Sequence, residues 1–474
     1  MVCSRCYDAA DQVYFAELSG DCNPLHLDAL AARRTPFGAP VVHGLHLVFW
    51  ALETACGRLS GPCALNSVRA VFRHAVTIGV PVELRLEEER AEVRLDGAVQ
   101  CALTWSMQRM DAGSSPLGPS AERLVCRRID DLTLLHNVRS STVLGLDRGL
   151  LRLHFPHLER TLPPLQLAIL LALSRAVGMD CPGERSLLTE LQVDFEAALP
   201  VEGPHLTLQV ETVDPRYHLV AMTCAAPGAR GNVKAFLRPV PVPQPDYAEV
   251  RAVAPSLDCS AVTALVVGGS RGLGEVTTKL LCAWGARVVA SYARCREQAE
   301  HLRAEILAHN PGAGLELLHL DVTEDEVRLR AALGGVLGVT HLFYFATPPI
   351  FTGRKGNFSE RLYREFLDYY VLAFHRVLAT LPPETGRLLN VFLPSSAALD
   401  EPRVPGLGEY TAAKGAAEAL AMVLSASGRY AISCPRLPRM ATDQTVSLLP
   451  VENRPVLGML APHLQRFLAT PTSA

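Results

Sequence analysis

The chain has 474 residues, a formal net charge of −3, 49% apolar residues and 20% charged residues. This length is enough for two to four domains of about 100–200 residues each, and the apolar content allows a large buried core. The near-neutral balance, without a basic block, argues against nucleic acid as the main partner and against electrostatic docking on a membrane.

The thirteen cysteines are odd in number, scattered and mostly set in apolar runs. This favours reduced thiols in a cytoplasmic protein over a disulfide framework. Cys3 and Cys6 form a CxxC with no second pair nearby, so we interpret them as incidental and expect no metal site. No apolar stretch resembling a signal peptide follows Met1. The longest apolar run, 165–173, is shorter than the roughly 20 residues that span a bilayer, so we expect a buried helix there.

The first motif that suggests chemistry is LSGDCNPLHLD at residues 18–28, followed by PVVHGL at residues 40–45. Asp21 and His26 are five residues apart, across an Asn-Pro turn, and could converge on one water or hydroxyl. A carboxylate and an imidazole together can remove a proton from carbon and help a hydroxyl leave. The amide of Gly44, at the start of an apolar helix, could receive a thioester oxygen as charge develops on it. By spacing alone, the same residues also fit an ordinary turn with a structural histidine.

The first two parts of the chain share one layout. Apolar helices are predicted over 44–56 and 164–177, each after a turn, and a turn-rich segment at 111–119 separates the two parts. Alternating strands are predicted after the helices, at 64–76, 82–94, 187–197, 205–213 and 219–225. One helix followed by several antiparallel strands suggests an α+β unit in which a sheet wraps around its helix, present twice.

The run at 18–28 with VVHGL after it resembles the MaoC-like, or hydratase 2, family of hot-dog folds. That family interconverts (R)-3-hydroxyacyl and trans-2-enoyl thioesters. The resemblance implies that Asp21 and His26 are the catalytic pair and that Gly44 is the oxyanion-hole glycine. The strong motif covers only residues 15–50, and the helix serine of the family has no clear match.

This resemblance predicts a hot-dog repeat with a dehydratase or hydratase site at 1–112. In residues 120–238 the Asp-x4-His spacing recurs only at 131–136, without the Asn-Pro turn and without a VVHGL run after it. We expect them to form a second, degenerate hot-dog repeat, which completes a double hot-dog and shapes the acyl tunnel.

The third part, 255–474, follows a proline-rich linker at 239–254, where alternating prolines favour a stiff, extended chain. Short continuous apolar runs alternate with helical patterns in it. The predicted strands are 261–267, 286–291, 315–320, 341–346 and 388–393. This alternation indicates an α/β Rossmann domain with a doubly wound parallel sheet.

A glycine-rich loop, GGSRGLG at residues 268–274, follows the first of these strands and opens a helix. Gly268, Gly272 and Gly274 allow a tight turn that brings backbone N–H groups against a pyrophosphate. The helix N-terminus adds its partial positive charge. The loop therefore predicts a dinucleotide site.

The identity of the cofactor follows from charge. A fold that prefers NAD normally ends its second strand with an acidic residue, whereas this strand ends in ASYAR, with no carboxylate. Arg271 in the glycine loop and Arg294 suit a 2′-phosphate, so we predict NADPH (NADP+). The alternative is that both arginines are only solvated.

Ser396 is followed by Tyr410-Thr-Ala-Ala-Lys414, and the chain has only four lysines. A tyrosine and a lysine four residues apart lie on one face of a helix. A nearby ammonium favours the phenolate, so we expect the pKa of Tyr410 to fall below its usual value of about 10. The tyrosine could then protonate a carbonyl oxygen that a serine hydroxyl holds. The alternative is a surface tyrosine beside a surface lysine.

Residues 261–445 resemble the short-chain dehydrogenase/reductase family, especially its β-ketoacyl reductases. The resemblance implies that Ser396, Tyr410 and Lys414 are catalytic, with Ser395 as a fallback because Ser396 is one position further from the tyrosine than usual. The predicted cofactor-binding residues are Gly268, Ser270, Arg271, Gly272, Leu273, Gly274, Arg294, Asp321, Val322, Ala346, Tyr410, Lys414 and Thr442. The segment ending at Thr442 resembles the one that closes over the nicotinamide.

Two departures from the family concern the proton relay. Tyr344-Phe-Ala346 stands where the family often has Asn-Asn-Ala. Tyr370 takes the position of the helix asparagine that supports the lysine through a water in the family. The relay in this chain is therefore expected to run differently or more slowly.

Together, the two resemblances predict a bifunctional enzyme. An NADPH-dependent ketoreductase would make a 3-hydroxyacyl thioester, and a dehydratase would convert it to a trans-2-enoyl thioester in fatty-acid or polyketide-type biosynthesis. The acyl group would ride on acyl carrier protein or coenzyme A. We expect a cytoplasmic homodimer, since both families commonly dimerise.

Three alternatives remain at this stage. The chain could act as an (R)-specific enoyl-CoA hydratase and 3-hydroxyacyl-CoA dehydrogenase in β-oxidation. One half could be non-catalytic and serve as an acyl-carrier-binding scaffold. The reductase could also accept free ketones.

Overall fold

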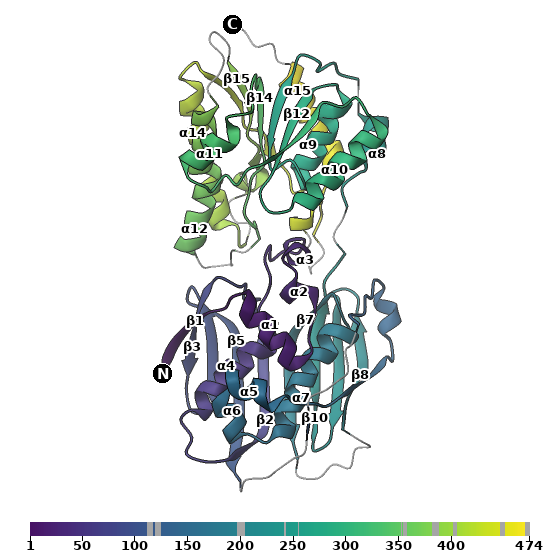
Figure 1. The fold of residues 1–474 in the computed structure, drawn as a ribbon, viewed down its shortest axis with the longest axis vertical. Helices are drawn as coiled ribbons and strands as arrows, with labels where there is room; N and C mark the ends of the chain where they lie inside the picture. Colours follow the sequence, from purple (N-terminus) through teal and green to yellow (C-terminus); the bar gives the residue numbers. More distant parts are fainter. Residues whose placement is uncertain are drawn as a thin grey trace. The chain divides into compact units, whose positions relative to one another are not determined.

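The structure is a computed structural model that describes the chain except for residues 111–116, 119–124, 197–203, 241–242, 255, 352, 354–357, 382–387, 402–404, 446–450 and 470–474. The chain divides into two compact units, one that runs to Val240 and one that follows it (Figure 1). Most of the predicted joint at 111–119 and part of the predicted linker at 239–254 lie outside the described residues.

The first unit is built on a ten-stranded antiparallel sheet with the order β1-β3-β4-β5-β2-β7-β10-β9-β8-β6. Its strands are β1 (Val2–Cys6), β2 (Cys63–Phe72), β3 (Pro81–Leu86), β4 (Arg90–Leu95), β5 (Ala98–Arg109), β6 (Arg139–Val143), β7 (Ser186–Phe195), β8 (His205–Asp214), β9 (Leu219–Ala226) and β10 (Ala229–Leu237). Strands β2 and β7 pair at the seam between two halves, where Val68 lies opposite Val193. Outward from this seam the two halves have the same order, with β5, β4, β3 and β1 corresponding to β10, β9, β8 and β6.

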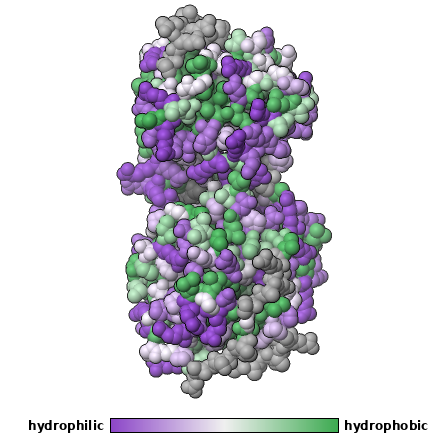
Figure 2. Space-filling model, viewed as in Figure 1, coloured by the Kyte–Doolittle hydropathy of each residue, from purple (hydrophilic) through white to green (hydrophobic). Residues whose placement is uncertain are grey.

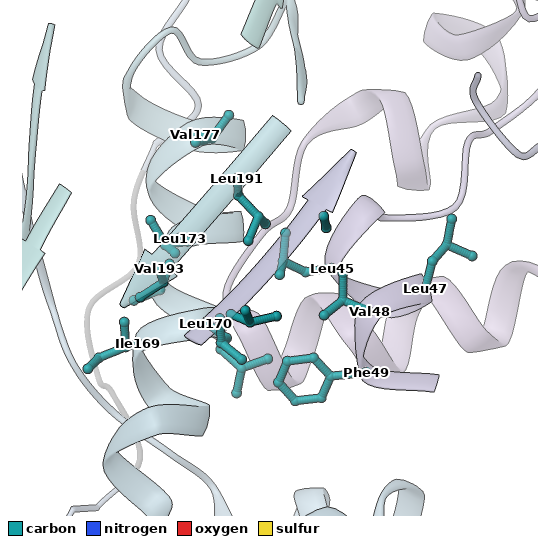
Figure 3. Packing of buried hydrophobic residues seen from close by; sticks show 14 of the residues in the cluster. Leu45, Leu47, Val48, Phe49, Ile169, Leu170, Leu173, Val177, Leu191 and Val193 are labelled. Atoms are coloured by element: carbon teal, nitrogen blue, oxygen red, sulfur yellow. The ribbon is translucent and has the colours of Figure 1, made fainter. Parts of the chain in front are cut away.

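Two buried helices lie against this sheet, α4 (Gly44–Cys56) and α7 (Pro164–Arg175). Both are apolar on nearly every side, as is typical of a helix enclosed by the core. Figure 3 shows Leu45, Val48 and Phe49 of α4 near Leu170 of α7, and all four belong to one hydrophobic cluster. The remaining helices of the unit are α1 (Ala9–Ser19), α2 (Pro24–Leu27), α3 (Ala29–Arg33), α5 (Arg148–His154) and α6 (Pro156–Thr161), with short turns η1 (Leu132–Leu135) and η2 (Ala176–Asp180).

The structure confirms the predicted helix at 44–56 and places the predicted strands in this unit within a few residues. The segment expected as one strand at 82–94 is instead the hairpin β3–β4. Three consecutive glutamates at 87–89 interrupt the apolar alternation there, and exposed polar residues are typical of such a turn.

The second unit has a six-stranded parallel sheet with the order β13-β12-β11-β14-β15-β17. Its strands are β11 (Thr263–Val267), β12 (Arg287–Tyr292), β13 (Leu315–His319), β14 (His341–Tyr344), β15 (Leu389–Phe392) and β17 (Tyr430–Ser433), beside a small pair β16 (Ser395–Ser396) and β18 (Arg436–Leu437). The helices are α8 (Tyr247–Val253), α9 (Gly272–Ala283), α10 (Arg296–His309), α11 (Glu326–Leu333), α12 (Glu360–Leu367), α13 (Phe374–Thr380), α14 (Gly408–Ser425) and α15 (Val456–Ala469), with the turns η3 (Asp368–Ala373), η4 (Ala397–Leu399) and η5 (Asp443–Thr445). The strand order reverses between β11 and β14, which is where such sheets bind nucleotides.

The sheet of the second unit is covered on both faces. Leu265 and Val267 of β11 belong to one hydrophobic cluster, whereas Ala264 and Val266 belong to another. Side chains alternate between the faces of a strand, so a strand buried on both faces must be apolar throughout. The predicted parallel α/β sheet is confirmed.

In the parts of the chain that the structure describes, no helix combines the length and apolar character needed to cross a membrane. The face drawn in Figure 2 mixes hydrophilic and hydrophobic residues.

Candidate active sites

Asp21 in the first unit lies in a tight loop after α1. The helix ends at Gly20, whose φ of 78° is in the left-handed region. The Asp21 amide donates to Ser19 Oγ at 3.1 Å, and the Asn23 amide donates to Asp21 Oδ1 at 3.3 Å. The Asn23 side chain caps α2, because its Oδ1 accepts from the Leu25 amide at 2.9 Å. The motif is therefore a turn, as its spacing suggested, and this turn buries the carboxylate.

His26 is oriented by a backbone carbonyl. Its Nδ1 lies 2.6 Å from the oxygen of Val41. A carbonyl only accepts, so Nδ1 carries the proton and Nε2 is free to act as a base. Burial lowers the pKa of His26, and the Asp21 charge partly opposes this. The imidazole is therefore neutral at physiological pH.

The second half of the sheet supplies the partner of the Asp21 carboxylate. Ser174 of α7 donates its hydroxyl to Asp21 Oδ2 at 2.8 Å. Burial raises the pKa of Asp21, and His26 and the Ser174 hydrogen bond oppose this rise. The sequence showed no clear match for the helix serine, because Ser174 reaches Asp21 only through the packing of α7 beside the Asp21 loop.

Backbone groups of the second half also shape the site. A Cβ on Gly178 would lie 2.3 Å from Asp21 Oδ1, so only glycine fits there. The Asn23 side chain donates to the oxygen of Gly178 at 2.7 Å and to that of Glu184 at 3.1 Å. Residues predicted to be without chemistry therefore form one wall of the Asp21 site.

Gly44 is the first residue of α4. The first amides of a helix have no partner within it, so this N–H is suited to receive an oxygen. A Cβ at this position would lie 3.1 Å from the ring of Phe72. The structure therefore places Gly44 at a helix N-terminus, as the sequence suggested. The ring of Phe72 packs closely against it.

His43 stacks on His26 with ring centroids 3.8 Å apart and planes inclined by 26°. Its Nε2 lies 3.0 Å from the Asp21 carbonyl oxygen, and its Nδ1 lies 3.0 Å from Gln12 Oε1. Potential ligand atoms of Asp21, His26 and His43 come within 4.8 Å of one another. A single ion cannot lie in the planes of two stacked rings, so this geometry is poor for a metal. Sequence reasoning gave His43 no role.

The second unit has a glycine cradle at the end of β11. Gly268 and Gly272 have φ values of 76° and 56°. A Cβ on Gly274 would lie 2.1 Å from the oxygen of Gly268, so the turn requires glycine there. The cradle opens into the N-terminus of α9, and these features fit a dinucleotide pyrophosphate.

Other predicted cofactor residues surround this cradle. A Cβ on Gly268 would lie 3.2 Å from the Ala346 amide, and one on Gly272 would lie 3.7 Å from the Thr442 side chain. Asp321 follows β13 and accepts from the Thr323 amide at 3.0 Å. The remaining predicted members close to the loop, Ser270 and Leu273, are buried and half-buried, and Val322 is buried.

The two predicted phosphate-binding arginines differ. Arg294 is exposed just beyond β12. Arg271 Nη1 forms an ion pair with Asp443 Oδ2 at 3.0 Å. The prediction of NADPH took both arginines to lack an acidic partner. For Arg271 this is wrong, because the segment after Thr442 brings a carboxylate to it. A phosphate would have to compete with Asp443.

The structure brings Ser396, Tyr410 and Lys414 together. The Ser396 hydroxyl is close enough to the Tyr410 phenol to lower its pKa. The Lys414 Nζ is 5.9 Å from the centroid of the Tyr410 ring and donates to the Pro394 oxygen at 2.8 Å. Ser395 instead donates to Glu418 Oε1. The geometry thus favours Ser396 over the fallback.

The expected lowering of the Tyr410 pKa is wrong for the protein without cofactor. Burial raises the pKa of Tyr410, and only the Ser396 hydrogen bond opposes it. Burial also lowers the pKa of Lys414 to about 8. The shared cause is desolvation, which disfavours the charged form of each group.

Residues 3–100 match the family model described as MaoC like domain, and residues 262–434 match that described as short chain dehydrogenase. The chain joins a MaoC-like domain to a short-chain dehydrogenase domain. The first is a hot-dog domain, and the second contains the Rossmann-type parallel sheet. The predicted fusion is confirmed.

Two curated relatives match the MaoC-like domain. A 3-hydroxybutyryl-CoA dehydratase of Methylorubrum extorquens is 40% identical over 93 residues, which is 18% of this chain and 59% of that protein. An (R)-specific enoyl-CoA hydratase of Aeromonas caviae is 50% identical over 44 residues, 9% of this chain and 33% of that protein. The chain thus spans about three fifths and one third of the lengths of these relatives.

Solved structures resemble the dehydrogenase domain. A short-chain oxidoreductase of Pseudomonas aeruginosa PAO1 with an atypical catalytic center has 25% identity and a TM-score of 0.35, over 40% of this chain and 73% of that one. A short-chain dehydrogenase of Burkholderia cenocepacia J2315 in complex with NADP has 22% identity and a TM-score of 0.39, over 46% of this chain and 93% of that one.

Proposed function

We propose that this chain is a bifunctional enzyme, an NADPH-dependent 3-oxoacyl-thioester reductase and an (R)-3-hydroxyacyl-thioester dehydratase. Its product would be a trans-2-enoyl thioester for fatty-acid or polyketide-type biosynthesis. The observation that carries the proposal is that one chain holds two ordered sets of side chains, whose chemistry would act on the same substrate carbon. These are Asp21 with His26 in one unit, and Tyr410 with Ser396 and Lys414 in the other.

We further propose that the first unit is a double hot-dog, with repeats at 1–112 and 120–238. The matching strand order on either side of the β2–β7 seam supports this, as do the two enclosed helices α4 and α7. The linker would be 239–254 and the reductase domain 255–474. The second repeat supplies Ser174, whereas its own Asp131 and His136, at the same spacing as Asp21 and His26, are exposed.

In the dehydratase reaction, His26 Nε2 takes the proton from C2 of the 3-hydroxyacyl thioester. The C3–O bond breaks, the double bond forms between C2 and C3, and the hydroxyl leaves as water with a proton from Asp21. The raised pKa of Asp21 suits this donation. The Gly44 amide holds the thioester oxygen while it carries negative charge.

In the reductase reaction, NADPH supplies hydride to the carbonyl carbon when it is bound. Tyr410 gives its phenolic proton to the carbonyl oxygen, which Ser396 holds in place. Lys414 lies beside Tyr410 and helps to position its side chain. The cradle formed by Gly268, Ser270, Gly272, Leu273 and Gly274 would hold the pyrophosphate, and the other predicted contacts are Asp321, Val322, Ala346 and Thr442.

The preference for NADPH rests on Arg271 and Arg294. A guanidinium recognises a phosphate through several N–H groups. Tighter binding of NADH than of NADPH would contradict this assignment and favour the alternative of hydration followed by NAD-linked oxidation.

The test supplies purified protein with a short 3-oxoacyl thioester and NADPH and identifies the products by mass. We expect loss of water after reduction. Asp21→Ala should stop at the 3-hydroxyacyl thioester, and Tyr410→Phe should leave the 3-oxoacyl thioester unchanged. Full activity in either variant would favour the alternative in which that half is a scaffold.

A further inference from the structure

The ammonium of Lys414 lies on the face of an aromatic ring. Its Nζ is 4.0 Å from the centroid of the Tyr370 ring. It also donates to the Pro394 oxygen at 2.8 Å. Lys414 is 8% exposed and Tyr370 is 1% exposed, so bulk water has little access to this contact.

The Tyr370 ring is itself fixed by its neighbours. Its hydroxyl shares a hydrogen bond of 2.5 Å with Thr347 Oγ1. Phe366 stacks on the ring at 5.8 Å with planes 9° apart, and Tyr410 meets its edge at 5.8 Å. Tyr370 belongs to the π-turn η3, an irregular turn of the kind that often marks functional positions. The ring therefore presents its face to Lys414 in one orientation.

An aromatic face attracts a cation because its quadrupole is negative there. This attraction is larger where both partners are shielded from water. The family resemblance places an asparagine here, which supports the lysine through a water. A tyrosine ring fills this space and offers its π-electrons instead.

We propose that Tyr370 is a positioning residue of the reductase, whose ring face holds the Lys414 ammonium beside Tyr410 in place of a bound water. The catalytic consequence rests on the proposed reductase function. The contact between the ring and the ammonium is independent of that function.

Other groups near Lys414 act on its charge in known directions. Glu418, on the same helix, favours the ammonium, although Arg436 also binds this carboxylate. Cys434, in the segment after β17, has a thiol pKa that burial raises to about 11, so it is neutral at pH 7. Burial opposes the ammonium and lowers the pKa of Lys414 to about 8. Among the described residues, the ring and the Pro394 carbonyl oxygen are the further groups that can favour the cation.

The charge of Lys414 can be measured without any reaction. The chain has four lysines, at 234, 279, 355 and 414. In protein labelled with [13Cε]lysine, four signals are expected, and Lys414→Arg identifies the one of interest. Its chemical shift across pH gives the Lys414 pKa directly.

Three substitutions at one position then separate the role of the ring from that of its volume. Tyr370→Phe keeps the face and should leave the Lys414 pKa unchanged. Tyr370→Leu keeps the site dry but removes the face, so the pKa should fall by about one unit. Tyr370→Asn admits water and an amide oxygen, so the pKa should rise towards the usual lysine value.

A series of fluorinated phenylalanines at position 370 provides a second measurement if the leucine variant does not fold. Fluorine withdraws charge from the ring face with little change in volume, so the Lys414 pKa should fall as fluorine atoms are added. An unchanged pKa across this series, or an equal shift in Tyr370→Phe and Tyr370→Leu, would overturn the proposal.

Kinetics connect this contact to catalysis. The kcat for reduction of a 3-oxoacyl thioester should fall about threefold in Tyr370→Leu near pH 7.5, with KM little changed, and its pH profile should move with the Lys414 signal. Tyr370→Phe should retain both. If the wild type reduces no thioester but its Lys414 signal follows the predicted series, the proposed function fails and the ring contact stands.

Discussion

At the scale of single residues, the proposed dehydratase site includes a hydroxyl from the other half of the ten-stranded sheet unit. Ser174→Ala removes the 2.8 Å hydrogen bond to the buried Asp21 carboxylate. We expect kcat/KM for crotonyl-thioester hydration to fall by about 10- to 100-fold. Thr54→Ala on α4 is the matched control, since its hydroxyl donates to the Trp50 backbone oxygen at 2.8 Å and lies outside the Asp21 site. Equal losses in the two variants would remove Ser174 from the site.

The pH dependence of dehydration of a 3-hydroxyacyl thioester, the direction in which His26 acts as the neutral base, tests the state of His26. Its pKa is lowered because burial disfavours the imidazolium. Proton uptake therefore requires a lower pH than usual, and the neutral base persists on the acid side of an ordinary histidine value of about 6.5. A plot of kcat/KM against pH should stay level through that value and decline only below it. An acid limb centred at or above it would contradict the assignment of His26 as base.

At the scale of elements, the turn η2 can pack against the Asp21 carboxylate because residue 178 is a glycine without a side chain. Gly178→Ala would place a Cβ 2.3 Å from Asp21 Oδ1 and displace the carboxylate. A shift of this size in a catalytic group typically costs about 100-fold. Hydration should fall to that extent, while Gly61→Ala, with no atom within 4 Å of the added Cβ, should retain full rate. An active Gly178→Ala enzyme would show that the carboxylate is not needed in this place.

The segment at η5 and the glycine loop are joined by the Arg271–Asp443 ion pair. If Arg271 binds the 2′-phosphate, Asp443→Asn removes a competitor. NADPH should then bind about 2- to 5-fold more tightly, within the range of partly exposed ion pairs, with NADH unaffected. Fluorescence titration of both nucleotides measures this. Arg271→Gln is the counterpart, in which NADPH should bind more weakly; tighter NADH binding in Asp443→Asn would point to a role other than phosphate competition.

Much of the element pattern was readable from the sequence, and some of it was not. The helix at 44–56 and the glycine loop at 268–274 carry local signals, namely continuous apolar character and glycines that a turn requires. Ser174 carries no local signal, because its role arises only when α7 packs beside the Asp21 loop. The raised pKa of Tyr410 was missed for a similar reason, since burial depends on the whole fold and outweighs a lysine four residues away.

At the scale of the whole molecule, the two proposed reactions occur at separate centres, so they can be complemented. Asp21→Ala retains the reductase groups, and Tyr410→Phe retains the dehydratase groups. An equal mixture should form the enoyl thioester from the 3-oxoacyl thioester and NADPH after a lag, while each variant alone forms none. Mass analysis over time shows the lag. A mixture that never forms the enoyl product would mean that the intermediate does not pass through solution.

The seam between β2 and β7 has a consequence for stoichiometry. Both halves belong to one polypeptide and share one backbone sheet. They are therefore present in equal numbers in every molecule. A chain with two unlike halves has one acid–base dyad where a pair of identical halves would have two. A tight-binding enoyl-thioester analogue should therefore saturate the protein at one equivalent per polypeptide, whatever the number of polypeptides that associate.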